Sequence, residues 1–196
     1  TFTGEIIIKF AKPLEPYNNH NSSSLMKKTI LVTGGTGFIG SHTTVELQNA
    51  GYDVVIIDNL SNSKADVVDG IEKITGIRPA FEEVDCCDLP KLESVFQKYP
   101  GIQGIIHFAA SKAVGESVEK PLMYYENNLL SLINLLKLMP KYDVKGIIFS
   151  SSCTVYGQPD PENLPVTEEA PIKKAESPYG NTKQINEEIV QDYVKS

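Results

Sequence analysis

The sequence contains 196 residues, of which 41% are hydrophobic and 22% are charged, the usual balance of a globular protein with a substantial core. The formal net charge of −7 argues against a nucleic-acid-binding surface, for which a basic patch is expected. No apolar run approaches the length of a membrane span, so we expect neither nucleic acid nor membrane as a partner.

The cysteines are too few, and odd in number, for a disulfide framework. Cys86, Cys87 and Cys153 are most simply reduced thiols, and we expect a cytoplasmic protein. No histidine or second thiol pair stands at ligand spacing from Cys86 and Cys87, so no metal site is expected.

Residues 1–27 are rich in Asn, Ser, Pro and Lys and show no periodicity that continues past Phe10. They lack the plan of a signal peptide, because the short apolar run Ile6–Ile8 lies between charged residues. We expect a disordered N-terminal extension outside the fold, with Met26 as a candidate native start.

From Lys28 onward, short apolar strand runs alternate with segments of helical periodicity. The first strand, 28–35, ends in glycines, and the helix expected over 38–53 has Ile39, Val45 and Leu47 at helical spacing and a stop at Gly51. The later elements are expected in this order: strand 53–58, strand 77–85, helix 89–99, strand 104–110, helix 119–142, strand 145–152, loop 157–178 and helix 179–194.

This alternation indicates βαβ units with right-handed crossovers and a parallel sheet. We therefore predict an α/β Rossmann domain over residues 28–196, with a doubly wound sheet and helices on both faces.

The turn after the first strand reads TGGTGFIG and predicts a dinucleotide site. Glycines at Gly34, Gly37 and Gly40 let the turn tighten and the backbone approach a pyrophosphate, which the N-terminus of the next helix attracts. Asp58 follows at the end of the second strand, where a carboxylate can accept hydrogen bonds from both ribose hydroxyls and would repel a 2′-phosphate. The pattern favours NAD over NADP.

Tyr179 and Lys183 lie four residues apart, on one face of the predicted last helix. An ammonium near a phenol favours the phenolate and lowers its pKa, which is one way to make tyrosine a base. Such pairs are also common on ordinary surface helices. Here the strand ends HFAASK and FSSSCTVYG bring small residues and serine hydroxyls to the cofactor edge, which favours the functional interpretation.

Several motifs together resemble the UDP-glucose 4-epimerase (UDP-galactose 4-epimerase) family of the extended short-chain dehydrogenases/reductases. They are TGGTGFIGSHTTVEL, DNLSNSK, EEVDCCD, IIHFAASKAVGESVEKPLMYYENN, IFSSSCTVYG and SPYGNTK. The Y-x-x-x-K pattern marks the wider superfamily, whereas KAVGES and SSS-x-TVYG are closer to the epimerases themselves. DNLSNS and EVDCCD look most like fungal forms, in which an epimerase can be fused to a mutarotase.

The resemblance implies an NAD site at the phosphate loop and the strand ends. Its implied cofactor-binding residues are Gly34, Gly37, Phe38, Ile39, Gly40, Asp58, Asn59, Asn62, Ser63, Asp85, Cys86, Phe108, Ala109, Ala110, Ser111, Lys112, Asn127, Ser152, Tyr179 and Lys183. Among these it assigns Phe38 and Ile39 to the pyrophosphate, Asp58, Asn59, Asn62 and Ser63 to the adenosine ribose, and Asp85 and Cys86 to the adenine.

The implied catalytic residues are Tyr179, Lys183 and Ser152, and the implied substrates are UDP-galactose and UDP-glucose. Tyr179 would take the proton of the sugar 4-hydroxyl while hydride leaves C4 for NAD, and the 4-keto sugar would turn over and be reduced again. Ser152 would bind the sugar 4-hydroxyl, and Lys183 would hold the nicotinamide ribose. The resemblance also implies a homodimer through the long helix.

The sequence departs from the family at three places. Ala110 and Ser111 stand where the family usually has Gly-Leu, and Cys153 where it has Ala, and we expect tolerance of both changes. The chain also stops at Ser196, before the segments that complete the substrate-binding part in the family, so a truncated enzyme is expected.

Three alternatives remain open. A nucleotide-sugar dehydratase is disfavoured because Ser152, Cys153 and Thr154 stand where those enzymes carry carboxylates. An epimerase acting on N-acetylated or uronic sugars fits the same motifs. A non-catalytic NAD-binding fragment is the alternative from another functional class.

Overall fold

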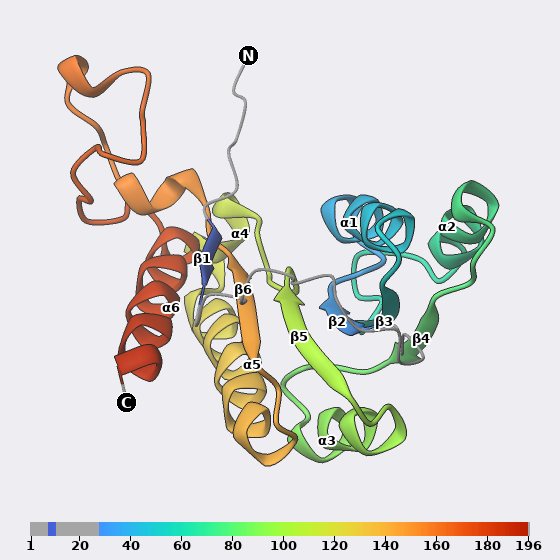
Figure 1. The fold of residues 1–196 in the computed structure, drawn as a ribbon. Coiled ribbons are helices and arrows are strands. Elements are labelled where there is room, and N and C mark those ends of the chain that lie inside the picture. Colours follow the sequence, from blue (N-terminus) through green and yellow to red (C-terminus); the bar gives the residue numbers. More distant parts are fainter. Residues whose placement is uncertain (1–7, 11–27, 196) are drawn as a thin grey trace, which may run out of the picture.

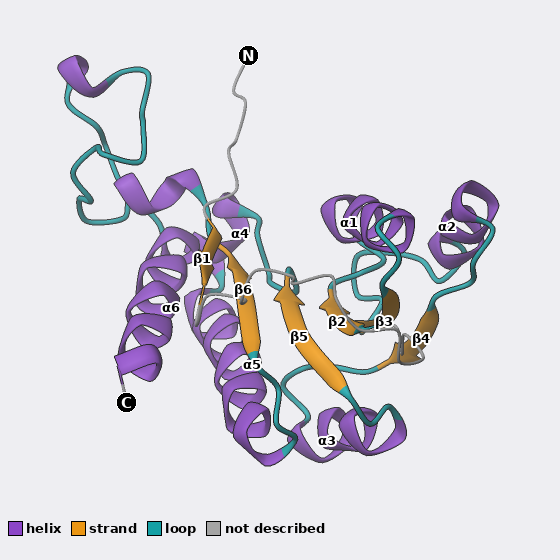
Figure 2. Cartoon of the chain, viewed as in Figure 1, coloured by secondary structure: helices purple, strands orange, loops and turns teal. Residues whose placement is uncertain are grey.

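The computed structural model describes residues 8–10 and 28–195. Its core is a six-stranded sheet in the order β1-β6-β5-β2-β3-β4 (Figures 1 and 2). The strands are β1 (Ile8–Phe10), β2 (Thr29–Thr33), β3 (Asp53–Asp58), β4 (Ala80–Glu83), β5 (Ile102–His107) and β6 (Gly146–Ser150). All pairs from β4 through to β6 are parallel.

Helices cover both faces of the sheet. They are α1 (Phe38–Asn49), α2 (Val67–Thr75), α3 (Leu89–Lys98), α4 (Val114–Glu119), α5 (Pro121–Lys141) and α6 (Pro178–Lys195), with short 3-10 turns η1 (Cys153–Tyr156) and η2 (Pro161–Asn163). The chain runs from the central β2 outward to β3 and β4, then crosses to β5 and β6 on the other side. The predicted doubly wound α/β fold is confirmed.

Strand residues alternate between two buried clusters because successive side chains point to opposite faces of a sheet. Leu31 and Val55 belong to the larger cluster, with residues of α3, α5 and α6, whereas Val32 and Val54 pack with residues of α1 and α2. Figure 1 shows α1 and α2 on one side of the sheet and α3 and α5 on the other. Such strands, buried on both faces, read as continuous apolar runs, which is why they were recognisable in the sequence.

The predicted N-terminal extension differs from the structure at one point. Residues Ile8–Phe10 form β1, which pairs antiparallel with β6, with Ile8 opposite Ser150. For these residues the prediction was wrong, because the outer edge of β6 offers backbone N–H and C=O groups to which an extended segment can bond. The rest of residues 1–27 lies outside the described residues.

Two helices were not predicted. One is α4, which ends at Glu119, where the helix predicted over 119–142 was expected to begin; α5 itself begins at Pro121. The stretch read as polar between β3 and β4 contains α2, which buries Val68 and Ile71 and ends at Gly76 with φ +74°. Its Asp66 N-cap position has no side-chain cap hydrogen bond, so the usual start signal is weak.

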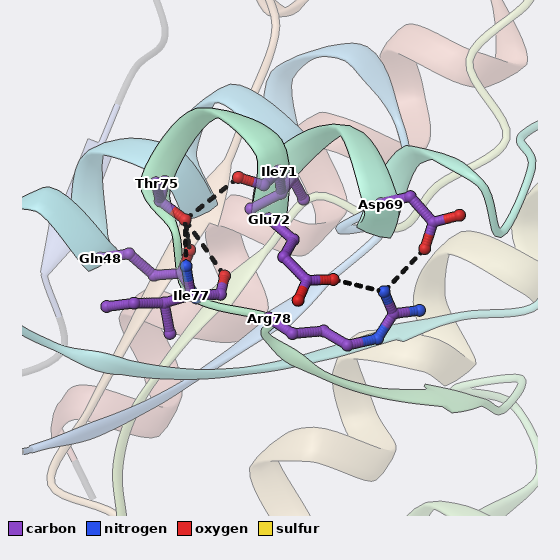
Figure 3. A network of polar contacts seen from close by, with 7 residues as sticks. All are labelled: Gln48, Asp69, Ile71, Glu72, Thr75, Ile77 and Arg78. Atoms are coloured by element: carbon purple, nitrogen blue, oxygen red, sulfur yellow. Dashed lines mark hydrogen bonds and ion pairs between the residues drawn. The ribbon is translucent and has the colours of Figure 1, made fainter.

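A surface network fixes α2 (Figure 3). Arg78 pairs with Asp69 and Glu72 at 2.7 Å each, and the hydroxyl of Thr75 lies 2.9 Å from Oε1 of Gln48 on α1. The ion pairs are exposed to solvent and contribute little to stability, so the apolar face of α2 supplies most of it.

The predicted loop 157–178 contains η2 and is anchored at its base. Gln184 of α6 donates hydrogen bonds from Nε2 to the carbonyls of Val155 and Lys173. Gly157, at φ +61°, lies against the backbone of Lys174, where an added Cβ would stand 2.4 Å from the carbonyl oxygen. Both ends of the loop are thus tied to the start of α6.

No helix in the described ranges is both long and apolar enough to cross a bilayer. Within those ranges the His, Cys, Asp and Glu side chains also form no cluster of three or more that could hold a metal ion.

Candidate active site

A cavity of about 320 Å³ lies at the carboxyl ends of the strands. Its position follows from the topology, because the loops after β2 and β5 diverge where the order of the strands reverses, and ligands of doubly wound sheets bind there. All of the predicted cofactor and catalytic residues except Ser63 line this cavity. Further lining residues, not on the predicted list, are Ile57, Ser61, Val84, Ser131, Ser150, Ser151 and Cys153.

The glycine turn is built for close backbone contacts. Gly34 has φ +67°, and an added Cβ would stand 2.8 Å from the amide nitrogen of Ala109. At Gly40 the added Cβ would stand 2.3 Å from the carbonyl oxygen of Gly34, which leaves no room for a side chain. The turn can therefore adopt this shape only with glycine at these positions.

The N-terminus of α1 opens onto the cavity. Its N-cap residue Gly37 provides no side-chain cap, so the N–H groups of the first turn keep their capacity to bind an anion. The apolar side chains of Phe38 and Ile39 are 77% and 42% exposed at this rim. The arrangement suits a ligand with phosphates and apolar parts side by side.

Asp58 is held by the loop that follows it. The 8%-exposed carboxylate accepts hydrogen bonds from the backbone of Thr36 at 3.3 Å and of Leu60 at 3.0 Å, and from the hydroxyl of Ser63 at 3.0 Å. Ser63 does not line the cavity; its oxygen also lies 2.7 Å from Oγ1 of Thr36. Ser63 therefore braces Asp58 from behind, which differs from the predicted contact with ribose.

The predicted adenine end is a second small network. Oδ2 of Asp85 accepts a hydrogen bond from the amide of Asn59 at 3.0 Å, and its Oδ1 accepts one from the backbone of Cys87 at 2.8 Å. Burial raises the pKa of Cys86 far above the ordinary value and that of Cys87 to about 12, so both stay neutral thiols.

The loop after β5 is fastened to the long helix. Asn128, 1% exposed, accepts from the backbone N–H of Ser111 at 2.8 Å and donates to the Ser111 carbonyl at 2.9 Å and to Thr182 at 3.0 Å. The neighbouring Asn127 donates to the hydroxyl of Ser111 at 3.2 Å. Asn128, which lies on α5, thus ties the loop after β5 to its own helix and to α6.

The start of α6 explains the sequence SPYG. The hydroxyl of Ser177 accepts from the N–H of Gly180 at 3.1 Å, and Pro178 stands at the first helical position, the usual beginning of a helix. This cap fixes the register in which Tyr179 and Lys183 face the cavity.

Lys183 is 4% exposed and lies beneath the cavity. Its Nζ donates to the carbonyl of Ser150 at 2.7 Å and lies 4.7 Å from the ring centroid of Phe149. Burial lowers the pKa of Lys183 to about 8, and the carboxylate of Glu187 opposes that change. The ammonium therefore stays mostly protonated at neutral pH but loses its proton at a lower pH than an exposed lysine would.

Tyr179 differs from expectation in one respect. We predicted that Lys183 lowers the pKa of Tyr179, but that pKa is raised, with burial as the largest cause. A hydrogen bond with Ser152 acts in the opposite direction. Lys183 lies 5.9 Å from the ring centroid and directs its hydrogen bond to Ser150, so its effect on the phenol is weak.

His107, at the end of β5, has hydrogen-bond partners at both ring nitrogens. Its Nδ1 lies 2.7 Å from the hydroxyl of Thr33, and its Nε2 lies 3.5 Å from that of Ser131. Burial, with the charge of Lys183, lowers the pKa of His107 to about 3, so the ring is neutral. It supports the cavity wall rather than exchanging protons.

Sequence reasoning missed the residues that brace the cavity from behind. Thr36 and Asn128 carry ordinary polar side chains with no spacing that distinguishes them. Glu187 had a usable signal, because it follows Tyr179 and Lys183 at the same four-residue interval and so falls on their face of α6.

Comparison with protein families matches residues 30–196 to the NAD dependent epimerase/dehydratase family. UDP-glucose 4-epimerase uge1 of Schizosaccharomyces pombe is 51% identical over 169 residues, which are 85% of this chain and 47% of that protein. The bifunctional protein GAL10 of Pachysolen tannophilus is 52% identical over 165 residues, 83% of this chain and 24% of that one.

Among solved structures, UDP-glucose 4-epimerase from Bifidobacterium longum, in complex with NAD+ and UDP, superposes with a TM-score of 0.80 and 50% identity. The match covers 84% of this chain and 48% of that one. The chain spans about half the length of the single-function curated relatives that it matches.

Proposed function

The chain belongs to the NAD dependent epimerase/dehydratase family, and we propose that the protein interconverts UDP-galactose and UDP-glucose at C4 with NAD as cofactor. The observation that supports this proposal most is that one cavity is lined by the glycine turn, by Asp58 and by the side chains of Ser152, Tyr179 and Lys183. Relatives named as UDP-glucose 4-epimerases, whose sequences are 51% and 52% identical to this chain over the matched residues, favour the same reaction.

The residues present fit NAD. The turn at Gly34 and Gly40 leaves space that any Cβ would fill, and the uncapped N-terminus of α1 can receive the pyrophosphate. Asp58 presents a braced carboxylate where the adenosine ribose would lie, and a 2′-phosphate would be repelled there. When bound, NAD supplies a hydride acceptor and donor.

The chain's own side chains then divide the remaining work. Tyr179, in its phenolate form, accepts the proton of the sugar 4-hydroxyl and later returns it, as a general base and acid. Ser152, whose hydroxyl opposes the rise in the pKa of Tyr179, orients the sugar hydroxyl. Lys183 supplies a fixed positive charge beside them and holds the ribose of the nicotinamide.

Two further parts of the proposal concern the whole protein. We propose a cytoplasmic location, supported by free Cys86, Cys87 and Cys153. A homodimer through α5 stays a prediction; in its favour, Leu122 is 80% exposed and Met123 39% exposed on that helix.

A non-catalytic NAD-binding role is the second candidate, because the glycine turn and Asp58 favour a dinucleotide whether or not chemistry follows. The two functions share the glycine turn and Asp58 but differ in what they require of Tyr179. Turnover therefore separates them, whereas cofactor binding does not.

The test is conversion of UDP-galactose to UDP-glucose by the chain, alone and continued by the remaining segment of a matching relative. We expect Tyr179→Phe to retain NAD and lose at least ~10²-fold in kcat, since that is the usual contribution of a general base. The matched control is Tyr52→Phe, at the opposite end of the sheet, which should match the unsubstituted protein. Substantial turnover in Tyr179→Phe would reject Tyr179 as the base. If the unsubstituted chain binds NAD but shows no turnover, either alone or continued by the relative's segment, the non-catalytic role is favoured.

A further inference from the structure

Three residues of α6 face three consecutive serines at the end of β6. Lys183 donates to the carbonyl of Ser150 at 2.7 Å, Glu187 accepts from the hydroxyl of Ser151 at 2.5 Å, and Tyr179 lines the same cavity as Ser152. The helix residues are spaced at i, i+4 and i+8, so they lie along one face. The serine turn is thus joined to α6 by hydrogen bonds at Ser150 and Ser151.

Glu187 is as deeply buried as the lysine it accompanies. Its exposed fraction is 5% and that of Lys183 is 4%. A buried carboxylate is costly unless it is hydrogen-bonded and close to a positive charge, and both conditions hold here. Its neighbour Glu188 is exposed on the other side of the helix, so the burial of Glu187 is specific to this face.

We propose that Glu187 is a positioning residue of the active site, which fixes the Ser150–Ser152 turn against α6 through Ser151 and so sets Ser152, Tyr179 and Lys183 relative to one another. The proposal rests on the proposed function for the roles of those three residues. The role of Glu187 itself is argued from its contact, burial and spacing, and it touches neither substrate nor cofactor in this account.

The carboxylate has a second consequence for Lys183. It opposes the burial that lowers the pKa of Lys183 to about 8. The titratable groups facing Lys183 are Tyr179 and Glu187 on α6 and the neutral His107 on β5. Since His107 and Tyr179 carry no negative charge near neutral pH, Glu187 is the group that keeps the ammonium protonated.

The test compares Glu187→Gln with Glu188→Gln as the matched control. Glutamine keeps an oxygen for the Ser151 hydroxyl but removes the charge, so the fold should survive and the Lys183 pKa should fall. The direct readout is a pH titration by NMR of ε-¹³C-labelled lysine, with the Lys183 signal assigned through Lys183→Arg. We expect a midpoint lower by about one pH unit in Glu187→Gln and unchanged in the control.

Titration with NAD gives the functional readout. NAD binding needs the protonated form of Lys183 in this account. The lower Lys183 pKa in Glu187→Gln should therefore weaken NAD binding about fivefold at pH 8 and less than about twofold at pH 6. Ser151→Ala keeps the carboxylate, so its Lys183 midpoint should stay near that of the unsubstituted chain. A double-mutant cycle between Ser151→Ala and Glu187→Ala should show a coupling in unfolding free energy.

An unchanged Lys183 midpoint in Glu187→Gln, or a Ser151–Glu187 coupling of zero, would overturn the proposal. Both measurements can be made without NAD, so they stand even if the chain binds no cofactor. Failure of NAD binding in the unsubstituted chain would instead contradict the proposed function.

Discussion

Lys183 brings a positive charge to an almost fully buried position, with the Ser150 carbonyl as its hydrogen-bond acceptor. The charge is expensive to bury, and its pKa of about 8 measures that cost. A structural role alone would be served as well by an apolar side chain of similar length. The cost is therefore best explained by a need for an ammonium in the cavity.

The first prediction follows from this pKa. The unfolded value is near ~10.5 and the folded value about 8, so as pH rises the folded chain loses the proton first. The burial cost is therefore fully present below pH 8 and is relieved between pH 8 and ~10.5. Relative to Lys183→Met, the unfolding free energy of the unsubstituted chain should rise by about 2 to 3 kcal/mol across that range.

Urea unfolding at a series of pH values measures this difference. Lys137→Met, at an exposed position of α5, is the control and should follow the unsubstituted chain at every pH. Parallel curves for Lys183→Met and the unsubstituted chain would show that Lys183 is not buried as described.

The residue scale also shows why part of the site could not be predicted. The interval between Tyr179 and Lys183 was visible, but the depth of burial that raises the Tyr179 pKa was not. Likewise, Ser63 lies close to Asp58 in sequence, and its place behind the carboxylate depends on the path of the whole loop. A side chain's contacts across the fold are absent from local spacing.

At the scale of elements, α1 was predicted correctly, but its most deeply buried side chains are polar. Val45 and Leu47, from the expected apolar stripe, pack partly buried against the core, whereas the fully buried side chains are those of Thr44 and Gln48. Ile39 lies at the rim of the cavity, and the hydroxyl of Thr44 donates a hydrogen bond to the carbonyl of Gly40. Hydrophobic periodicity did not indicate that Ile39 would line the cavity, because its position depends on the glycine turn before α1.

The missed elements have related causes. The helix α2 contains Gly70 and starts without a side-chain cap, so propensity argued against it while tertiary packing stabilised it. Strand β1 has three residues, and its pairing depends on a neighbouring edge that lies far along the chain. By contrast, β2, β3, β5 and β6 were visible as apolar runs, because they are buried on both faces.

The second prediction concerns the junction of β2 and α1. Gly40→Ala would place a Cβ 2.3 Å from the carbonyl oxygen of Gly34, so the turn must open. We expect a loss of about 1 to 3 kcal/mol in unfolding free energy and at least tenfold weaker NAD binding, since the turn and the helix N-terminus no longer fit the pyrophosphate.

The control for Gly40→Ala is Gly70→Ala in α2, where an added Cβ meets nothing within 4 Å. There alanine should stabilise the chain by about 0.5 to 1 kcal/mol, because it restricts the unfolded chain and favours the helix. Urea unfolding and NAD titration of both variants measure the contrast. Equal behaviour of the two variants would contradict the role given to the glycine turn.

At the scale of the whole molecule, one topological fact places the site. The chain crosses from β4 past the central β2 to reach β5, so the loops after β2 and β5 part and leave the cavity between them. The glycine turn and Asp58 arrive from one side of this crossing, and Ser152, Tyr179 and Lys183 from the other. Sequence order alone was enough to predict this meeting, because right-handed parallel crossovers leave few other arrangements.

The most direct measurement of the account is calorimetric titration of NAD into the purified chain, after removal of any nucleotide that co-purifies. We predict saturable one-to-one binding, weaker NADP binding because of Asp58, and loss of NAD binding in Gly40→Ala. A chain that is folded by circular dichroism and binds no NAD would contradict the central claim that this cavity is a dinucleotide site.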